Sequence, residues 1–170
     1  MINIWCGFSR NKGNLALFSK LISSVEARQY SHAYIRYVCP ISGEVMIFQA
    51  SKGIVNCMNY EIFLEHNEVV KEYKIQCEYL QFQKFYKFKC QNLGKKYSFT
   101  QILWFGLKKL FQIKLWPKSI YNLIKNGDSE YICSEIAAVV CILTGININL
   151  IQLDQVSPSD LDTLLENHYG

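Results

Sequence analysis

Cys133 is the residue of this chain whose setting points most directly to covalent chemistry. It follows a polar loop, residues 126–129, and precedes a run of small and apolar residues typical of a buried helix that ends near Leu143, before Gly145. A thiol at a helix N-terminus lies near unpaired backbone N–H groups and the positive end of the helix dipole. That environment favours the thiolate, which is the nucleophilic form of cysteine. The pattern therefore predicts a nucleophilic thiol at the start of this helix.

A thiol nucleophile needs a base, and His32 is the histidine that an ordered pattern surrounds. Residues 30–38 are rich in aromatic and β-branched side chains, which is typical of a strand. His66 lies in an expected exposed turn, and His168 lies near the end of the chain. We therefore expect His32 to be the general base, held by a strand.

Gln49 is the residue that we expect to orient the His32 ring. Residues 39–43 have turn composition, and a second strand follows from residue 44. A hairpin that pairs Tyr37 with Glu44 places His32 opposite Gln49, where cross-strand side chains are in reach of each other. Cysteine on a helix start, histidine on a strand and a polar third residue are the arrangement of a papain-like site.

Each of these residues also has a structural interpretation when it is taken alone. Cysteine is often a small buried hydrophobe, which is the interpretation that we prefer for Cys141. Gln49 alone is an ordinary strand residue. Glu135 is expected to stabilise the helix start, where the helix dipole favours a carboxylate. A direct catalytic role is not expected of it, because a carboxylate beside a thiolate would raise the pKa of the thiol.

The composition fits a single globular domain over residues 1–170. The charged fraction is 19% and the net charge is +4, which is too small to indicate nucleic-acid binding. The seven cysteines include no C-x-x-C pair, so we expect no metal and no cofactor. We recognise no signal peptide and no apolar run of transmembrane length, so we expect a cytoplasmic protein with reduced cysteines.

Hydrophobic periodicity and turn residues predict an α+β fold, in which an antiparallel sheet of about five strands packs against helices. The strands are expected at residues 2–9, 30–38, 44–50, 54–58 and 69–77. Helices are expected at residues 14–25, 60–66, 79–93, 99–113, 133–143 and 158–167. For residues 84–90 a strand is the weaker alternative. Ser157 is expected to cap the last helix, with Pro158 in its first turn and Asp160 completing a capping box.

Five short motifs occur in the order in which a known family has them. They are Tyr30-Ser31-His32-Ala33, Phe48-Gln49-Ala50-Ser51-Lys52-Gly53-Ile54-Val55, Leu93-Gly94-Lys95-Lys96-Tyr97-Ser98-Phe99, Tyr131-Ile132-Cys133-Ser134-Glu135 and Ser157-Pro158-Ser159-Asp160-Leu161. With them the chain resembles the circularly permuted NlpC-type branch of the papain-like cysteine hydrolases. That branch includes YiiX-like and related poxvirus proteins and, more distantly, lecithin:retinol acyltransferase.

The resemblance implies a papain-like fold in which the cysteine helix follows the histidine strand. It implies Cys133 as nucleophile and His32 as base, acting through a covalent thioester. Gln49 stands where many relatives have a Glu, and an amide can hold the imidazole by hydrogen bonding. The backbone N–H of Cys133 is the natural first oxyanion donor, with Tyr131 and Ser134 as its neighbours.

Peptides, amides and acyl lipids are the substrates that this chemistry fits, with Tyr97 and Trp104 expected to contact them. Residues 104–116 have an apolar stripe and a lysine-bearing face. A core-packing helix is the plainer interpretation, and contact with a membrane interface is the alternative. A second functional hypothesis is a catalytically inactive module that binds a partner or a membrane surface through its aromatic, Lys-rich 79–121 region.

Overall fold

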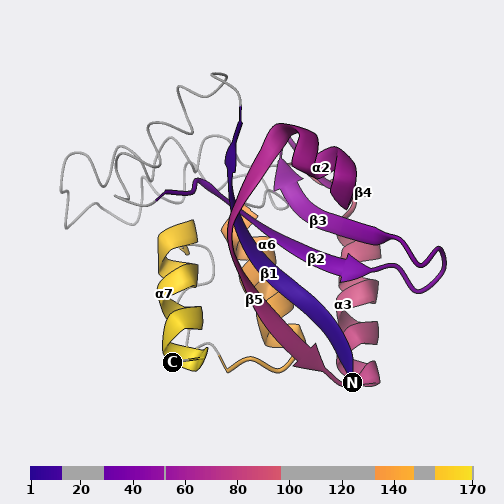
Figure 1. Ribbon diagram of the computed structural model, residues 1–170. Helices are drawn as coiled ribbons and strands as arrows, with labels where there is room; N and C mark the ends of the chain where they lie inside the picture. The colour runs from indigo at the N-terminus through magenta and orange to yellow at the C-terminus, as the bar shows by residue number, and fades with distance from the viewer. Residues whose placement is uncertain (13–28, 52, 97–132, 148–155, 170) are drawn as a thin grey trace, which may run out of the picture.

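The computed structural model describes residues 1–12, 29–51, 53–96, 133–147 and 156–169. In this part the fold is α+β, with a five-stranded antiparallel sheet and four helices (Figure 1). The α+β class and the antiparallel sheet of five strands expected from the sequence are therefore confirmed. The helices expected at 14–25 and 99–113, together with Tyr97, Trp104 and Tyr131, lie outside the described residues.

The sheet has the order β4-β3-β2-β1-β5, and all neighbouring strands are antiparallel. The strands are β1 (Ile2–Asn11), β2 (His32–Val38), β3 (Val45–Ser51), β4 (Ile54–Asn59) and β5 (Asn67–Cys77). β2 lies in the centre, which gives the strand that begins at His32 a paired neighbour on each side.

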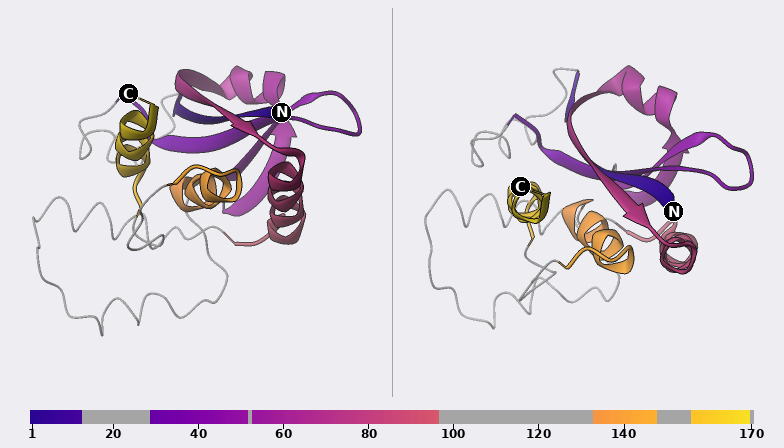
Figure 2. Two further views of the ribbon diagram at one scale, coloured as in Figure 1. Left: turned by 90° about the horizontal axis from the view of Figure 1, so that it is seen from below. Right: turned by 60° about the horizontal axis from the view of Figure 1, so that its bottom comes forward.

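The sheet is curled, and its two edges are connected by the short helix α2 (Tyr60–His66). Seven helical residues span about 10 Å, whereas the outer strands of a flat five-stranded sheet lie about 19 Å apart. The views in Figure 2 show the curl that brings β4 and β5 close enough for this connection. Asn59 caps the helix by accepting a hydrogen bond from the N–H of Glu61 at 2.8 Å.

Three further helices are described, and α6 packs against the sheet. They are α3 (Tyr79–Asn92), α6 (Cys133–Leu143) and α7 (Pro158–Tyr169). α6 lies on β2 and β3, between α3 and α7 (Figure 2). The helix expected at 79–93 is confirmed, so the strand alternative at 84–90 is wrong. None of the helices in the described ranges combines the length and apolar character needed to cross a bilayer.

The expected capping box at the start of α7 is present. The N–H of Asp160 donates to the hydroxyl of Ser157 at 3.2 Å, and the N–H of Ser157 donates to Asp160 Oδ2 at 3.1 Å. These bonds satisfy backbone donors that a helix start leaves unpaired. The local pattern around Pro158 therefore determines where α7 begins.

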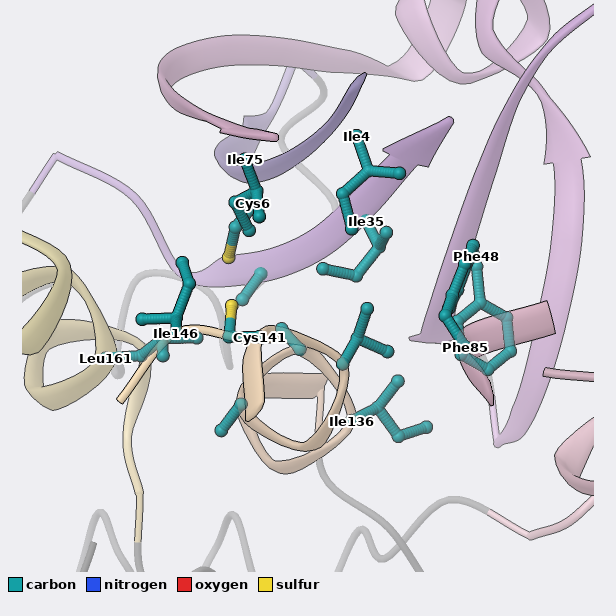
Figure 3. Packing of buried hydrophobic residues seen from close by; sticks show 14 of the residues in the cluster. Ile4, Cys6, Ile35, Phe48, Ile75, Phe85, Ile136, Cys141, Ile146 and Leu161 are labelled. Carbon is teal, nitrogen blue, oxygen red and sulfur yellow. The ribbon is translucent and has the colours of Figure 1, made fainter. Parts of the chain in front are cut away.

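The core lies between the curled sheet and α6. Ile4 and Cys6 of β1 and Ile35 of β2 lie on the α6 side of the sheet, in one cluster with Ile136 and Cys141 of the helix, and all are at most 1% exposed (Figure 3). The sulfur atoms of Cys6 and Cys141 point toward each other. The neighbouring Cys141 thiol and burial raise the pKa of the Cys6 thiol. Cys141 is thus a packed core residue, as its sequence setting predicted.

Candidate active site

His32 and Gln49 are joined by a side-chain hydrogen bond. The distance from His32 Nε2 to Gln49 Oε1 is 2.7 Å. His32 is the first residue of β2, and its strand partner on β1 is Ser9. Gln49 lies near the end of β3 and is 4% exposed. The sheet therefore holds the imidazole from a central strand and its polar partner from the next strand.

The register that we expected for this hairpin is wrong by two residues. The structure pairs Tyr37 with Met46 instead of Glu44, because the connection closes with the N–H of Cys39 donating to the Glu44 carbonyl at 2.8 Å. Side chains alternate between faces along a strand, so a shift of two residues keeps Gln49 on the same face. His32 and Gln49 consequently meet as a diagonal pair.

Cys133 is the first residue of α6, and its side chain contacts the His32 ring. The thiol is 5% exposed. Burial lowers the pKa of His32, but the hydrogen bond and charge interaction with Cys133, together with the hydrogen bond to Gln49, raise it more. The pKa of His32 therefore lies above its ordinary value. The structure thus brings together the three residues that the sequence singled out for catalysis.

The Gln49 amide has further partners on β4. Its Nε2 donates to Asn56 Oδ1 at 3.3 Å and to Met58 Sδ at 3.2 Å. Asn56 is the direct strand partner of Gln49, and Ser51 pairs with Ile54 across the turn. Asn56 was not predicted from the sequence as part of the site. A two-residue connection at positions 52–53, ending in Gly, was the signal that would have placed it opposite Gln49.

Ser134 has a structural role. Its side chain is fully buried, and its hydroxyl donates to the Val156 carbonyl at 2.5 Å. The hydroxyl therefore ties α6 to the segment before α7, and its expected place beside the oxyanion donor stays a prediction. Glu135 is buried in the first turn of α6, at 7% exposure, where a carboxylate is favoured by the helix dipole.

The described part of the aromatic 79–121 region is partly interior and partly surface, with Tyr79 65% exposed at the start of α3. Phe82 and Phe85 of α3 are core residues. Lys89 is 6% exposed, donates to the Tyr37 hydroxyl at 3.1 Å and lies 3.7 Å from the ring centre of Tyr86. These contacts account for Phe82, Phe85 and Tyr86, whereas Tyr79 stays exposed.

Cys39 is a thiol outside the candidate site whose pKa is lowered. Hydrogen bonds from the backbone and hydroxyl of Ser42 and from the backbone of Ile41 lower the pKa of Cys39 to about 7. Cys39 lies in the connection between β2 and β3, for which the sequence predicted a turn and no chemical role. Any labelling of Cys133 must therefore be resolved from labelling of Cys39.

Comparison with known proteins leaves the family open. No protein-family model matches the chain, and no curated protein matches it significantly. Membership of the permuted NlpC-type branch therefore stays a prediction that depends on the motifs.

Proposed function

We propose that this protein is a cysteine-dependent hydrolase or acyltransferase with a permuted papain-like fold, in which Cys133 is the nucleophile, His32 the base and Gln49 the residue that orients the base. The observation that carries the proposal is the His32 ring, which bonds Gln49 through Nε2 and contacts the Cys133 thiol. Because Nε2 is hydrogen-bonded to Gln49, Nδ1 is the ring nitrogen that can accept the thiol proton.

The reaction follows from these positions. The Cys133 proton passes to His32, and the sulfur attacks the carbonyl carbon of an acyl substrate. The backbone N–H at the start of α6 stabilises the oxyanion. When the carbon–leaving-group bond breaks, His32 returns the proton to the departing amine, alcohol or thiol, which leaves a thioester on Cys133. Water or an acceptor hydroxyl then loses a proton to His32, attacks the thioester, and releases the acid or transferred acyl product with a free thiol.

The substrate class that we propose is a peptide, another amide or an acyl lipid. Each supplies an acyl carbon and a leaving group that His32 can protonate. A membrane-interface contact belongs to the acyl-lipid version of the proposal, and it depends on residues 104–116, outside the described residues.

The second candidate is a catalytically inactive module of the same fold that binds a partner or a membrane surface. The 5% exposure of Cys133 favours it, because a nucleophile must be reached by its substrate. Phe82 and Phe85 pack inward and cannot serve such a surface, so on α3 it would depend on the exposed Tyr79 and Leu80.

Alkylation resolved by residue separates these candidates. In a Cys39→Ser background, iodoacetamide at near-neutral pH should modify Cys133 faster than the exposed Cys90, which serves as an internal reference. His32→Ala should slow Cys133 by on the order of 10²-fold, since a positioned base contributes that much or more. His66→Ala is the matched control and should change nothing. Equal rates for Cys133 and Cys90, or a Cys133 rate that is indifferent to His32→Ala, would leave the inactive module as the better description.

Acylation provides the second readout. Brief exposure to p-nitrophenyl acetate followed by acid quenching should leave an acetyl group on Cys133, detected by peptide mass spectrometry. Release of that group at neutral pH should require His32. Acetylation of Cys39 alone would contradict the proposed nucleophile.

A further inference from the structure

A line of side-chain amides extends from a backbone carbonyl to the His32 ring. Asn56 Nδ2 donates to the Ser51 carbonyl at 3.4 Å and to the Ser51 hydroxyl at 3.0 Å. Asn56 Oδ1 accepts from Gln49 Nε2 at 3.3 Å, and Gln49 Oε1 lies 2.7 Å from His32 Nε2. Three strands contribute to this line, because Asn56 belongs to β4, Gln49 to β3 and His32 to β2.

The direction of these bonds is determined by the end of the line at Ser51. A backbone carbonyl can only accept, so the NH₂ group of Asn56 must face it and the Asn56 oxygen must face Gln49. The Asn56 oxygen can only accept, so the NH₂ group of Gln49 must donate to it. The same NH₂ group also donates to the sulfur of Met58 at 3.2 Å. Gln49 is left with its oxygen toward His32. A proton must then reside on His32 Nε2, in the neutral and the protonated ring alike.

We propose that Asn56 is a positioning residue that sets the proton of His32 on Nε2 by fixing the orientation of the Gln49 amide. The catalytic consequence rests on the function proposed above, since Nδ1 is then free to accept the Cys133 proton. The placement of the proton itself is independent of any activity. A glutamate in place of Gln49 would need no such partner, because both of its oxygens accept. An amide at this position has one correct orientation, and Asn56 supplies the bond that selects it.

Asn56→Ala removes the selecting bond and leaves Met58 Sδ as a weak acceptor. A neutral hydrogen bond changes such an equilibrium by a factor on the order of ten. The reversed amide presents NH₂ to the ring and moves the neutral-ring proton to Nδ1. We therefore expect Cys133 alkylation to slow by on the order of tenfold. Asn56→Asp retains an acceptor for Gln49, so it should restore the rate.

The proton position can be measured directly by ¹⁵N NMR of the histidine side chains. The Cys133→Ser variant is the background, because its hydroxyl stays neutral where a thiolate would itself attract the proton. At about pH 8.5, above the ordinary histidine pKa of about 6.5, the His32 ring should show Nε2 protonated, and the signal is assigned by its loss in His32→Gln. Asn56→Ala should move signal toward the Nδ1-protonated form, and Asn56→Asp should not. Asn59→Ala is the matched control, since it removes an asparagine of the same strand that caps α2 and does not touch Gln49.

The Gln49→Glu background makes the test sharper. In that background the carboxylate of residue 49 faces Asn56 Oδ1, and two acceptor oxygens repel each other. Asn56→Ala should therefore leave Cys133 alkylation unchanged or speed it, whereas with Gln49 it slows the reaction. An equal loss in both backgrounds would show that Asn56 supports only the fold. In the Cys133→Ser background, a His32 ring protonated on Nδ1, or a proton position that Asn56→Ala does not change, overturns the proposal. If the NMR result holds and Cys133 remains unreactive, the proton placement stands and the proposed function fails.

Discussion

Asp162 holds the C-terminal helix against the sheet, and its removal is the largest stability effect that we expect outside the apolar core. The side chain lies on α7 and is 1% exposed. Its carboxylate accepts hydrogen bonds from the hydroxyls of Tyr30 at 2.5 Å and Tyr73 at 2.7 Å. Lys71 Nζ forms an ion pair with it at 3.0 Å. One buried carboxylate thus connects α7 to β5 and to the segment that leads into β2.

Asp162→Ala removes the acceptor of the Tyr30 and Tyr73 hydroxyls, whereas Lys71 is 34% exposed and keeps its pair with Glu166. Each hydrogen bond to a charged group contributes about 1.5–3 kcal/mol, so the loss is a large part of the roughly 5–15 kcal/mol that stabilises a typical domain. Urea unfolding at pH 7 measures the loss. Glu166→Ala is the matched control, because Glu166 pairs with the same Lys71 at 2.5 Å but is 45% exposed. An exposed pair contributes at most about 1 kcal/mol.

The pH dependence tests whether the charge of Asp162 is responsible. Burial raises the pKa of Asp162, but hydrogen bonds from Tyr30, Tyr73 and Lys71 lower it more, so the pKa in the folded protein lies below its ordinary value. The folded state then binds fewer protons, and the stabilisation is complete above about pH 4 and is lost as the pH falls through the folded-state pKa. The free-energy gap between wild type and Asp162→Asn should therefore narrow below about pH 4. A gap that stays constant down to about pH 2, or an Asp162→Ala cost equal to that of Glu166→Ala, refutes this reasoning.

Two further substitutions test the packing around β1. A Cβ added at Gly7 would lie 2.2 Å from Cζ of Tyr34, whose side chain is 1% exposed, so Gly7→Ala should cost about 3 kcal/mol in urea unfolding; a cost near zero would mean that the ring can move away. The Ser9 hydroxyl is fully buried and has no hydrogen-bond partner among the residues that the structure describes. Ser9→Ala should consequently raise the free energy of unfolding by about 1 kcal/mol, and a loss of stability would indicate a bound water at this hydroxyl.

Local patterns located the elements of this fold well. The start of α6 at Cys133 and the capping box of Asp160 follow from residues that are neighbours in the sequence. The pairing of β2 with β3 does not, because alternation of apolar and polar residues is equally satisfied by registers that differ by two residues. The length of the connection decided between them, and it is set by the bond between Cys39 and Glu44.

The polar line to His32 shows the same limit of sequence reasoning. The expected register was wrong by two residues, but such a shift keeps Gln49 on the face of His32, so Gln49 still lies beside the ring. Asn56 could be found only from the pairing of a third strand, β4. Hydrogen-bond direction adds information that no pattern of residue types contains. The carbonyl of Ser51 belongs to the backbone, so its effect on His32 through Gln49 becomes visible only once β3 and β4 are placed side by side.

The segment from Val156 through α7 forms hydrogen bonds with residues close to His32 and Cys133 in the sequence, and this gives a prediction for the site. Tyr30, which donates to Asp162, lies two residues before His32, and Ser134, which donates to the Val156 carbonyl, directly follows Cys133. Loosening α7 should therefore disturb the contact between the thiol and the imidazole before the protein unfolds. Under conditions where unfolding curves show each variant to be folded, Asp162→Ala should slow Cys133 alkylation by about tenfold, the effect of a loss of about 1.4 kcal/mol in the reactive arrangement. Equal rates in Asp162→Ala and Glu166→Ala would show that the sheet and α6 hold the site without help from α7.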